Sequence, residues 1–277
     1  MQTTLALDAA WRAMAYCLHP RVIYLSLLPL LIAAVTLGGL TWWGWSDGVA
    51  LVRHALDTWD ISQMMLNWLD RVGLGSLRVA LAPLLLVLLV VPLVLVACLL
   101  LVASLMTPAL VKLVRARRFP VLVSQSTTPW WHALGWSIGA SLTALLMMGL
   151  TLPLWFVPLL AMVLPPLIWG WLTYRVMAYD TLVDVATSDE RAQLLKAHRA
   201  TLLFIGVVCG YLGAAPAALW ALGALTVYLA PLMLLASVWI YTLVFAFSSL
   251  WFAHYLLSAL LTMRAQHASE PNHTLIS

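Results

Sequence analysis

The chain has 277 residues, of which 64% are hydrophobic and only 9% are charged. Water-soluble globular proteins have about 25% charged residues, so this composition excludes a soluble domain. The net charge of +4 comes from basic residues beside apolar runs, where membrane orientation accounts for them and no nucleic-acid partner is needed.

Two long runs, residues 119–174 and 200–263, contain no Asp, Glu, Lys or Arg. About 20 apolar residues form one helical span across a hydrocarbon core of about 30 Å, so each run can form a helical hairpin. We therefore predict an all-α, polytopic integral membrane protein. Residues 1–277 are expected to form a single integral membrane domain, with the lipid bilayer as its surroundings.

The first helix expected along the chain lies before Pro20. Leu7, Trp11, Met14 and Leu18 fall on one helical stripe, a pattern typical of a helix that lies at the membrane interface. The segment that follows is too long for a signal-peptide core and should remain as a membrane helix.

Six apolar segments are predicted, and they cover residues 22–43, 79–111, 133–152, 159–179, 201–223 and 232–263. Between the first two, residues 46–78 mix charged and apolar residues and are expected to form a surface amphipathic region. Prolines break the hairpins, and such segments can enter the bilayer without crossing it, so the number of full spans stays open.

Basic residues indicate the orientation. Most of the 14 Lys and Arg residues lie near the N-terminus, in the cluster of residues 112–118, in the polar connection 175–199 or at the C-terminal edge. Because cytoplasmic loops carry the excess of Lys and Arg, both termini are predicted to be cytoplasmic. Within the polar connection, Asp189 is expected to be the N-cap of a short helix that extends through Lys196.

Residues that could carry chemistry are scattered. Cys17, Cys98 and Cys209 have no metal-ligand or disulfide spacing, and no phosphate loop, metal helix or nucleophile elbow occurs. We therefore expect no catalytic residue, no metal and no cofactor. His132 and His254 are the histidines within the two charge-free runs; we interpret both as interfacial anchors, with a relay or gating role as the alternative.

Two glycine pairs, Gly135 with Gly139 and Gly206 with Gly210, have the spacing that lets helices approach closely; a role in a permeation path is the alternative. The proline-rich turns around residues 153–166 and 213–231 could instead present helix N-termini to a small anion. Turns that only pack the hairpins are an equally good interpretation.

Short motifs follow one another in a defined order over roughly residues 10–230. They are Leu28-Pro29-Leu30-Leu31, Trp42-Trp43, Thr107-Pro108-Ala109, Met177-Ala178-Tyr179-Asp180, Asp184, and a short charged helix with Lys196 and Arg199. This order resembles the CysZ-like sulfate permease family, which includes the etoposide-induced membrane proteins. The resemblance implies an oligomeric protein of the bacterial inner membrane, with long spanning helices and partly penetrating hairpins, that passes sulfate inward.

The chain departs from that family at the expected sulfate-binding element. The family carries a Gly-x-Arg-Arg-like motif before the first span, whereas the two arginine positions here are Ile23 and Tyr24, and only Arg21 lies near. Acidic positions in a later connection are replaced by Lys112, Arg115, Arg117 and Arg118. Arg21 is thus the expected substrate-binding residue, and it and the basic cluster would concentrate anions at the cytoplasmic mouth.

Two hypotheses of function result. The first is a CysZ-like permease or channel for a small solute such as sulfate, formed as a homo-oligomer, in which Tyr179, Asp180 and Asp184 have a structural or gating role at the hairpin base. The second is a membrane scaffold or assembly protein that moves no solute and uses the Trp- and Met-rich region 49–71 to bind a partner.

Overall fold

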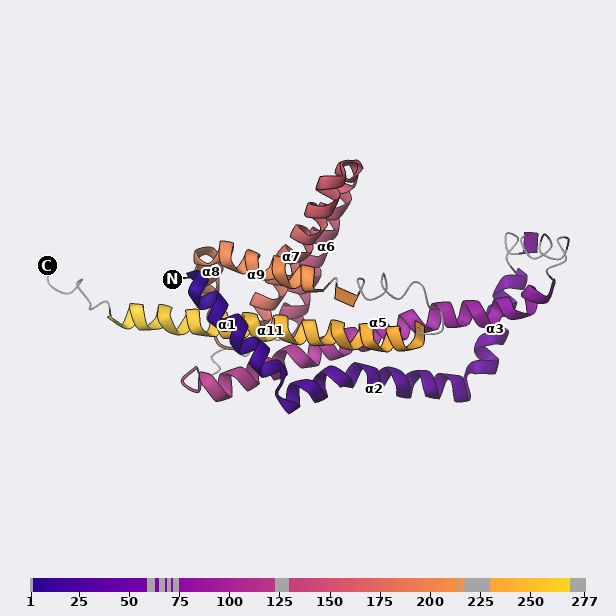
Figure 1. Cartoon of the computed structure of the whole chain (residues 1–277), viewed down its shortest axis with the longest axis horizontal. Helices are drawn as coiled ribbons and strands as arrows, with labels where there is room; N and C mark the ends of the chain where they lie inside the picture. The colour runs from indigo at the N-terminus through magenta and orange to yellow at the C-terminus, as the bar shows by residue number, and fades with distance from the viewer. Residues whose placement is uncertain are drawn as a thin grey trace. The chain divides into compact units, whose positions relative to one another are not determined.

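The computed structural model describes residues 2–58, 75–122, 130–213 and 230–269, together with positions 63, 64, 68, 71, 215 and 216 between them. The elements described are α1 (Gln2–Cys17), α2 (Pro20–Trp43), α3 (Trp45–Thr58), α5 (Gly75–Arg118), α6 (Trp130–Thr151), the 3-10 turn η1 (Leu152–Phe156), α7 (Pro158–Leu182), α8 (Ser188–Ala197), α9 (Arg199–Leu212) and α11 (Ala230–Ser269) (Figure 1).

All elements in these described ranges are helical, which confirms the all-α prediction. Five of the helices are long and apolar enough to cross a membrane, and α8 with α9, bent by 78°, could make a sixth as a broken span. The longest helix, α5, has 44 residues and is about 66 Å long, roughly twice the thickness of the bilayer core. The protein is therefore a polytopic helical membrane protein.

The helices follow the predicted apolar segments with longer ends. Predicted segments 79–111 and 232–263 lie inside α5 and α11, which run on through the flanking polar residues to Arg118 and Ser269. Segment 201–223 is represented by α9 to Leu212, and most of its remainder lies outside the described residues. In region 46–78 the structure describes α3 and the start of α5, and most positions between them are likewise outside the described ranges.

The chain divides into two compact units, residues 1–26 with 103–277 and residues 27–102. The second unit holds most of α2, all of α3 and the first part of α5. In it, a Cβ atom added to Gly48 of α3 would lie 3.1 Å from a methyl carbon of Leu86 on α5, so α3 packs closely on α5. The first unit holds the remaining helices.

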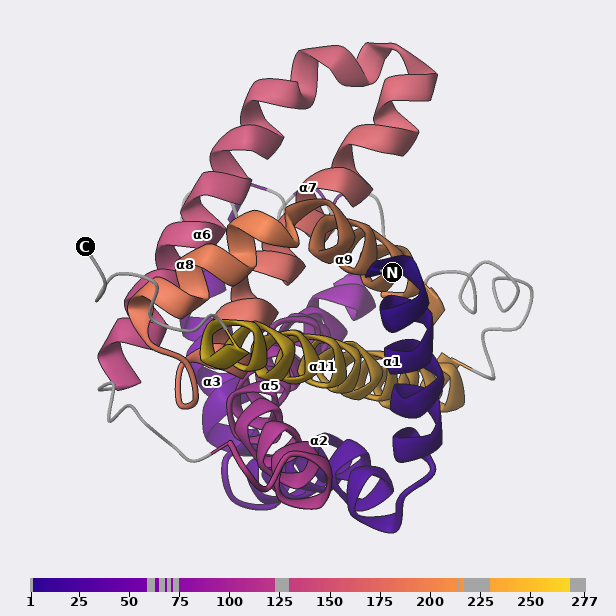
Figure 2. The ribbon, with the colours of Figure 1, turned by 90° about the vertical axis from the view of Figure 1, so that its left-hand side faces the viewer.

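In the first unit α1 crosses α11 (Figure 2). The small side chains of Ala6, Ala9 and Ala13 are buried between these helices, and the indole nitrogen of Trp251 donates a hydrogen bond of 2.9 Å to the backbone oxygen of Ala6. In the predicted stripe, Leu7, Trp11 and Met14 lie on the exposed side of α1, and Leu18, just after the end of the helix, is exposed as well. Alanine spacing, not the large apolar stripe, therefore fixes α1 to the protein.

Helices α7 and α9 lie in close contact in the first unit, and glycine makes this approach possible. A Cβ atom added to Gly206 would collide with the backbone oxygen of Gly170, and one added to Gly170 would lie 2.6 Å from the Cα atom of Val207. Gly210 also faces Gly170. The predicted packing role of Gly206 and Gly210 is thus confirmed, whereas Gly135 and Gly139 of α6 have no described neighbour within 4 Å of an added Cβ.

Helices α6 and α7 run side by side up to their turn (Figure 2). At the base of this hairpin, the indole nitrogen of Trp136 donates to the backbone oxygen of Arg175 at 3.2 Å. Pro165 and Pro166 lie inside α7, which continues through them. The sequence predicted that prolines interrupt the helices of this hairpin. The helices are interrupted at η1, between α6 and α7, and not at Pro165 and Pro166.

Candidate functional site

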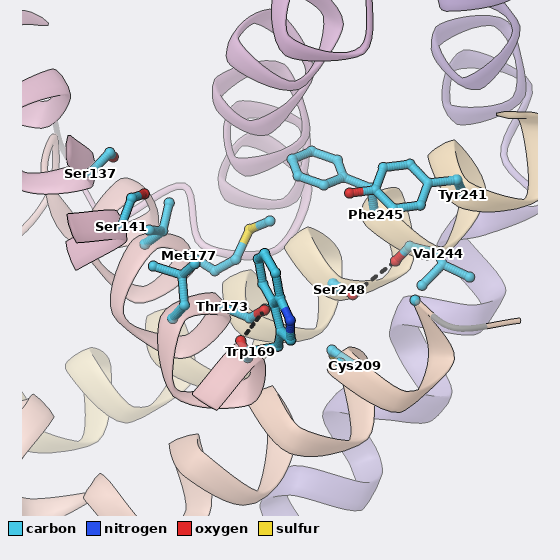
Figure 3. A pocket seen from close by; sticks show the side chains of 14 residues that line it. Ser137, Ser141, Trp169, Thr173, Met177, Cys209, Tyr241, Val244, Phe245 and Ser248 are labelled. Atoms are coloured by element: carbon cyan, nitrogen blue, oxygen red, sulfur yellow. Dashed lines mark hydrogen bonds between the residues drawn. The ribbon is translucent and has the colours of Figure 1, made fainter. Parts of the chain in front are cut away.

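A cavity of about 560 Å³ lies between four helices of the first unit (Figure 3). Its walls come from α6, α7, α9 and α11, and the lining residues are Ser137, Ser141, Trp169, Leu172, Thr173, Val176, Met177, Cys209, Gly210, Gly213, Tyr241, Val244, Phe245 and Ser248. This volume falls within the range of about 300–1,000 Å³ that is usual for small-molecule sites. The close approach of α7 and α9 at their glycines sets the width of one wall.

Hydroxyls are the most frequent polar side-chain groups of the cavity. Five of its lining residues carry one, namely Ser137, Ser141, Thr173, Tyr241 and Ser248, and the described lining includes no Asp, Glu, Lys, Arg or His. A hydroxyl can donate or accept a hydrogen bond by rotation. The site can thus hold a polar solute or an anion by donation without a buried charge of its own.

Two of the hydroxyls donate to the backbone of their own helix, and two serines face the cavity from α6. Thr173 donates to the oxygen of Trp169 at 2.8 Å, and Ser248 donates to the oxygen of Val244 at 2.8 Å (Figure 3). Ser137 and Ser141, one helical turn apart and half-buried, line the opposite wall. These two serines are therefore the best-placed donors for a bound solute.

The predicted hairpin-base residues lie near this cavity but do not line it. The buried ring of Tyr179 stacks on Trp136 with centroids 5.0 Å apart, and Arg191 of α8 lies over the same tyrosine at 4.6 Å. Asp180 and Asp184 are half-buried at and just beyond the end of α7. Tyr179 of α7 thus contacts residues of α6 and α8, and the structural or gating role of Tyr179, Asp180 and Asp184 stays a prediction.

An ion pair that the sequence does not reveal holds the polar connection to α11. Arg264 donates to both carboxylate oxygens of Glu190, at 2.8 and 2.9 Å, and to the backbone oxygen of Val185 at 2.8 Å. The N-cap of α8 is Thr187, in a capping box with Glu190, so the prediction of Asp189 as N-cap is wrong by two residues. Thr187 is favoured as N-cap because Glu190 lies three residues after it, so the Glu190 carboxylate can accept a hydrogen bond from the Thr187 backbone amide.

The structure does not bring the predicted anion-binding residue to the cavity. Arg21 lies exposed in the first turn of α2 and is not among the lining residues. Arg115, Arg117 and Arg118 occupy the last turn of α5, and they too are absent from the lining. A role of these basic residues in concentrating anions stays a prediction.

The two predicted interfacial histidines have different outcomes. His254 is only 2% exposed, its ring meets the ring of Tyr16 at 4.8 Å, and neither ring nitrogen has a hydrogen-bond partner among the described residues. The anchor interpretation is therefore wrong for His254, because the packing of α1 on α11 covers it. The side chain of His132 lies outside the part of α6 whose side chains are described.

The turn between α6 and α7 is apolar and its backbone bonds are internal. The amide of Val157 donates to Leu154, and the amides of Leu160 and Ala161 donate to Val157. Pro153 and Pro158 stand at the first positions of η1 and α7, where a missing N–H leaves nothing unpaired. These three amides are therefore not available to an anion, and the half-helix site around residues 153–166 stays a prediction. Most of turn 213–231 lies outside the described residues.

The exposed side chains of this turn lead to a testable expectation about membrane depth. Phe156 is 92% exposed, and the turn has no charged residue, whereas a loop that emerges into water is normally polar. A cysteine at Phe156, in a chain without its native cysteines, is expected to resist membrane-impermeant maleimide from both sides, while one at exposed Asp189 reacts from one side. Labelling of position 156 from the side opposite to position 189 would instead show a full crossing.

Comparison with known proteins gives one match. The family described as sulfate transporter CysZ/etoposide-induced protein 2.4 matches residues 9–222, which is most of the chain. No match is found among the curated proteins or among the solved structures. The matched residues run from the middle of α1 to beyond α9 and include three walls of the cavity, whereas α11 lies beyond them. The chain belongs to the sulfate transporter CysZ/etoposide-induced protein 2.4 family, which is transporter-like.

Proposed function

We propose that this protein is a permease or channel for a small inorganic anion, with sulfate as the first substrate to test. It is proposed to act as a homo-oligomer in a bacterial inner membrane, with both termini in the cytoplasm and with no chemical step or cofactor. The family match supports a sulfate-transporter-like role. The observation that carries the proposal is the uncharged, hydroxyl-lined cavity between four apolar helices.

The cavity suits an anion that must both enter and leave. A buried cation would hold an anion tightly, whereas neutral hydroxyl donors replace part of its hydration with weaker bonds. The thiol of Cys209, the indole of Trp169 and the rings of Tyr241 and Phe245 complete the lining (Figure 3). Selectivity among anions then depends on the size of the anion relative to the cavity and on the number of hydroxyl donors that the anion can use.

The test is flux of radiolabelled sulfate into proteoliposomes, with phosphate and chloride as competitors and empty liposomes as the blank. Ser137→Ala combined with Ser141→Ala is expected to reduce sulfate flux about 30-fold, because each lost donor weakens the bound state by about 1 kcal/mol and about 1.4 kcal/mol corresponds to a factor of ten. Thr143→Val removes a hydroxyl from the same helix; Thr143 is exposed and bonds the backbone of Gly139, so this control should leave flux unchanged.

Three other results would change the proposal. Equal flux in the serine variant and the wild type would remove the cavity from the path. Flux of chloride or phosphate without sulfate would change the substrate. If the inserted wild-type protein conducted no anion at all, the scaffold hypothesis would replace transport.

A further inference from the structure

The C-terminal end of α5 carries four basic residues that the cavity does not account for. They are Lys112, Arg115, Arg117 and Arg118, which we name the α5 basic end, and the three arginines lie in the last turn of the helix. None of the four lines the cavity. Because α5 is one continuous helix from the uncharged run 79–111 through these residues, their positions along the helix axis are fixed.

The exposure of side chains along α5 places the basic end at the depth of lipid headgroups. Among the described residues of α5, large exposed apolar side chains run from Leu84 to Leu105. At 1.5 Å per residue this stretch is about 32 Å long, which matches a hydrocarbon core of about 30 Å. Lys112 follows about 10 Å further along the axis, and its flexible stem can extend back toward the membrane, so its ammonium group reaches the layer of lipid phosphates.

The cations are accessible, because a different face of the same helix end is buried. Leu110 and Val114 are fully buried. Lys112, Arg117 and Arg118 are exposed. Packing thus fixes this end of α5 while three positive charges remain open to the surroundings.

The charge of the α5 basic end is not balanced within the described part of the chain. Arg264 pairs with Glu190, whereas the cations of the basic end form no ion pair with a described residue. The sequence contains no Asp or Glu from residue 71 to residue 179. An anionic partner from outside the chain would lower the electrostatic energy of this surface.

An apolar turn directly follows the basic end and indicates which kind of partner fits. The amide of Phe119 donates to the backbone oxygen of Arg115 at 2.9 Å, and the amide of Leu122 donates to that of Phe119 at 3.0 Å. Phe119 and Leu122 are buried, whereas Val121 at the turn is 78% exposed. An exposed apolar side chain beside cations is typical of a surface that contacts a bilayer, where both anionic headgroups and hydrocarbon are present.

We propose that the α5 basic end binds the headgroups of anionic phospholipids, such as phosphatidylglycerol, in the leaflet that it meets. Each Lys or Arg near an anionic membrane surface raises the affinity for that surface about fivefold. Three exposed cations are therefore enough to select anionic over zwitterionic lipid. This inference goes beyond the proposed transport, because it requires no solute to move.

Native mass spectrometry of the purified full chain tests the site by counting the lipids bound as phosphatidylglycerol or phosphatidylcholine is added in detergent. The triple variant Lys112→Gln, Arg117→Gln and Arg118→Gln is expected to bind phosphatidylglycerol at least about tenfold more weakly than the wild type. Its affinity for phosphatidylcholine, which has no net charge, should not change. Higher salt should weaken the phosphatidylglycerol binding of the wild type more than that of the triple variant.

The matched control removes three exposed cations from other parts of the chain, in the variant Arg21→Gln, Lys196→Gln and Arg199→Gln. This control should keep most of the phosphatidylglycerol affinity. The melting temperature of each variant is measured in parallel, and if the triple variant does not fold, Arg117→Gln alone replaces it, with a loss of about fivefold expected.

Two results would overturn the proposal. The first is equal phosphatidylglycerol affinity in the wild type and the folded α5 variant, whether or not the variant loses binding of radiolabelled sulfate. The second is an equal loss in the α5 variant and the control, which would show general attraction by net charge and no site on α5.

Discussion

Gly206→Ala is expected to destabilise the protein by about 3 kcal/mol, at the upper end of the usual cost of overpacking. The new methyl group would meet the backbone oxygen of Gly170, which has no flexible side chain to move aside, and would lie 3.0 Å from the Cβ atom of Tyr174. Helices α7 and α9 would have to separate, and the cavity wall that they form would shift. Unfolding in detergent, followed by circular dichroism, measures the loss.

The matched control for this substitution is Gly139→Ala on α6. Gly139 also lies in a membrane helix, but an added Cβ meets no described atom within 4 Å, so the expected change is a small gain from the higher helix propensity of alanine. Equal stability of Gly206→Ala and the wild type would show that α7 and α9 are not in close contact. A large loss in Gly139→Ala would instead show that this face of α6 is covered in the assembled protein.

Loss of the Glu190–Arg264 pair is the second large effect expected. Each side chain of the pair is about three-quarters buried. Glu190→Gln removes the charge while keeping the shape of the side chain. Because a neutral amide no longer offsets the charge of Arg264 at this position, we expect a loss of about 2 kcal/mol, between the values for surface and buried pairs. Asp189→Asn, an exposed neighbour on the same helix, should change stability much less.

The same pair gives a pH dependence with a defined sign. The hydrogen bond from Arg264, with further help from Thr187, lowers the pKa of Glu190 from 4.5 to about 2. A carboxylate with a lowered pKa stabilises the folded state fully above its unfolded value and loses this contribution as the pH falls. Wild-type stability should therefore drop between about pH 4.5 and pH 2 by more than that of Glu190→Gln; identical acid profiles would contradict it.

The fold was largely predictable because the membrane permits few solutions. Long charge-free runs must be helices, since a bilayer offers no partner for open backbone groups, and the spacing of Gly206 and Gly210 correctly indicated a close contact. The partner of these glycines, Gly170, was not predictable, because nothing local links residues on two different helices. The prediction that internal prolines end helices was wrong for Pro165 and Pro166, which lie inside α7.

The candidate site was mostly not predictable, because it depends on which faces of separate helices meet. Ser137 with Ser141 and Tyr241 with Ser248 have helical spacing, and this is the one local signal that could have indicated a polar face. The burial of His254 was not predictable, because Tyr16, which packs against its ring, is distant in sequence.

The docking of α1 on α11 has a consequence for the order of assembly. Trp251 and Ala6, joined by a hydrogen bond, are 245 residues apart, and translation proceeds at about 5–20 residues per second. The alanine face of α1 must therefore wait about 10–50 s on or in the nascent membrane before its partner emerges. During that interval Ala6, Ala9 and Ala13 lack the helix that covers them, and a ribosome that stalls before α11 leaves α1 without this partner.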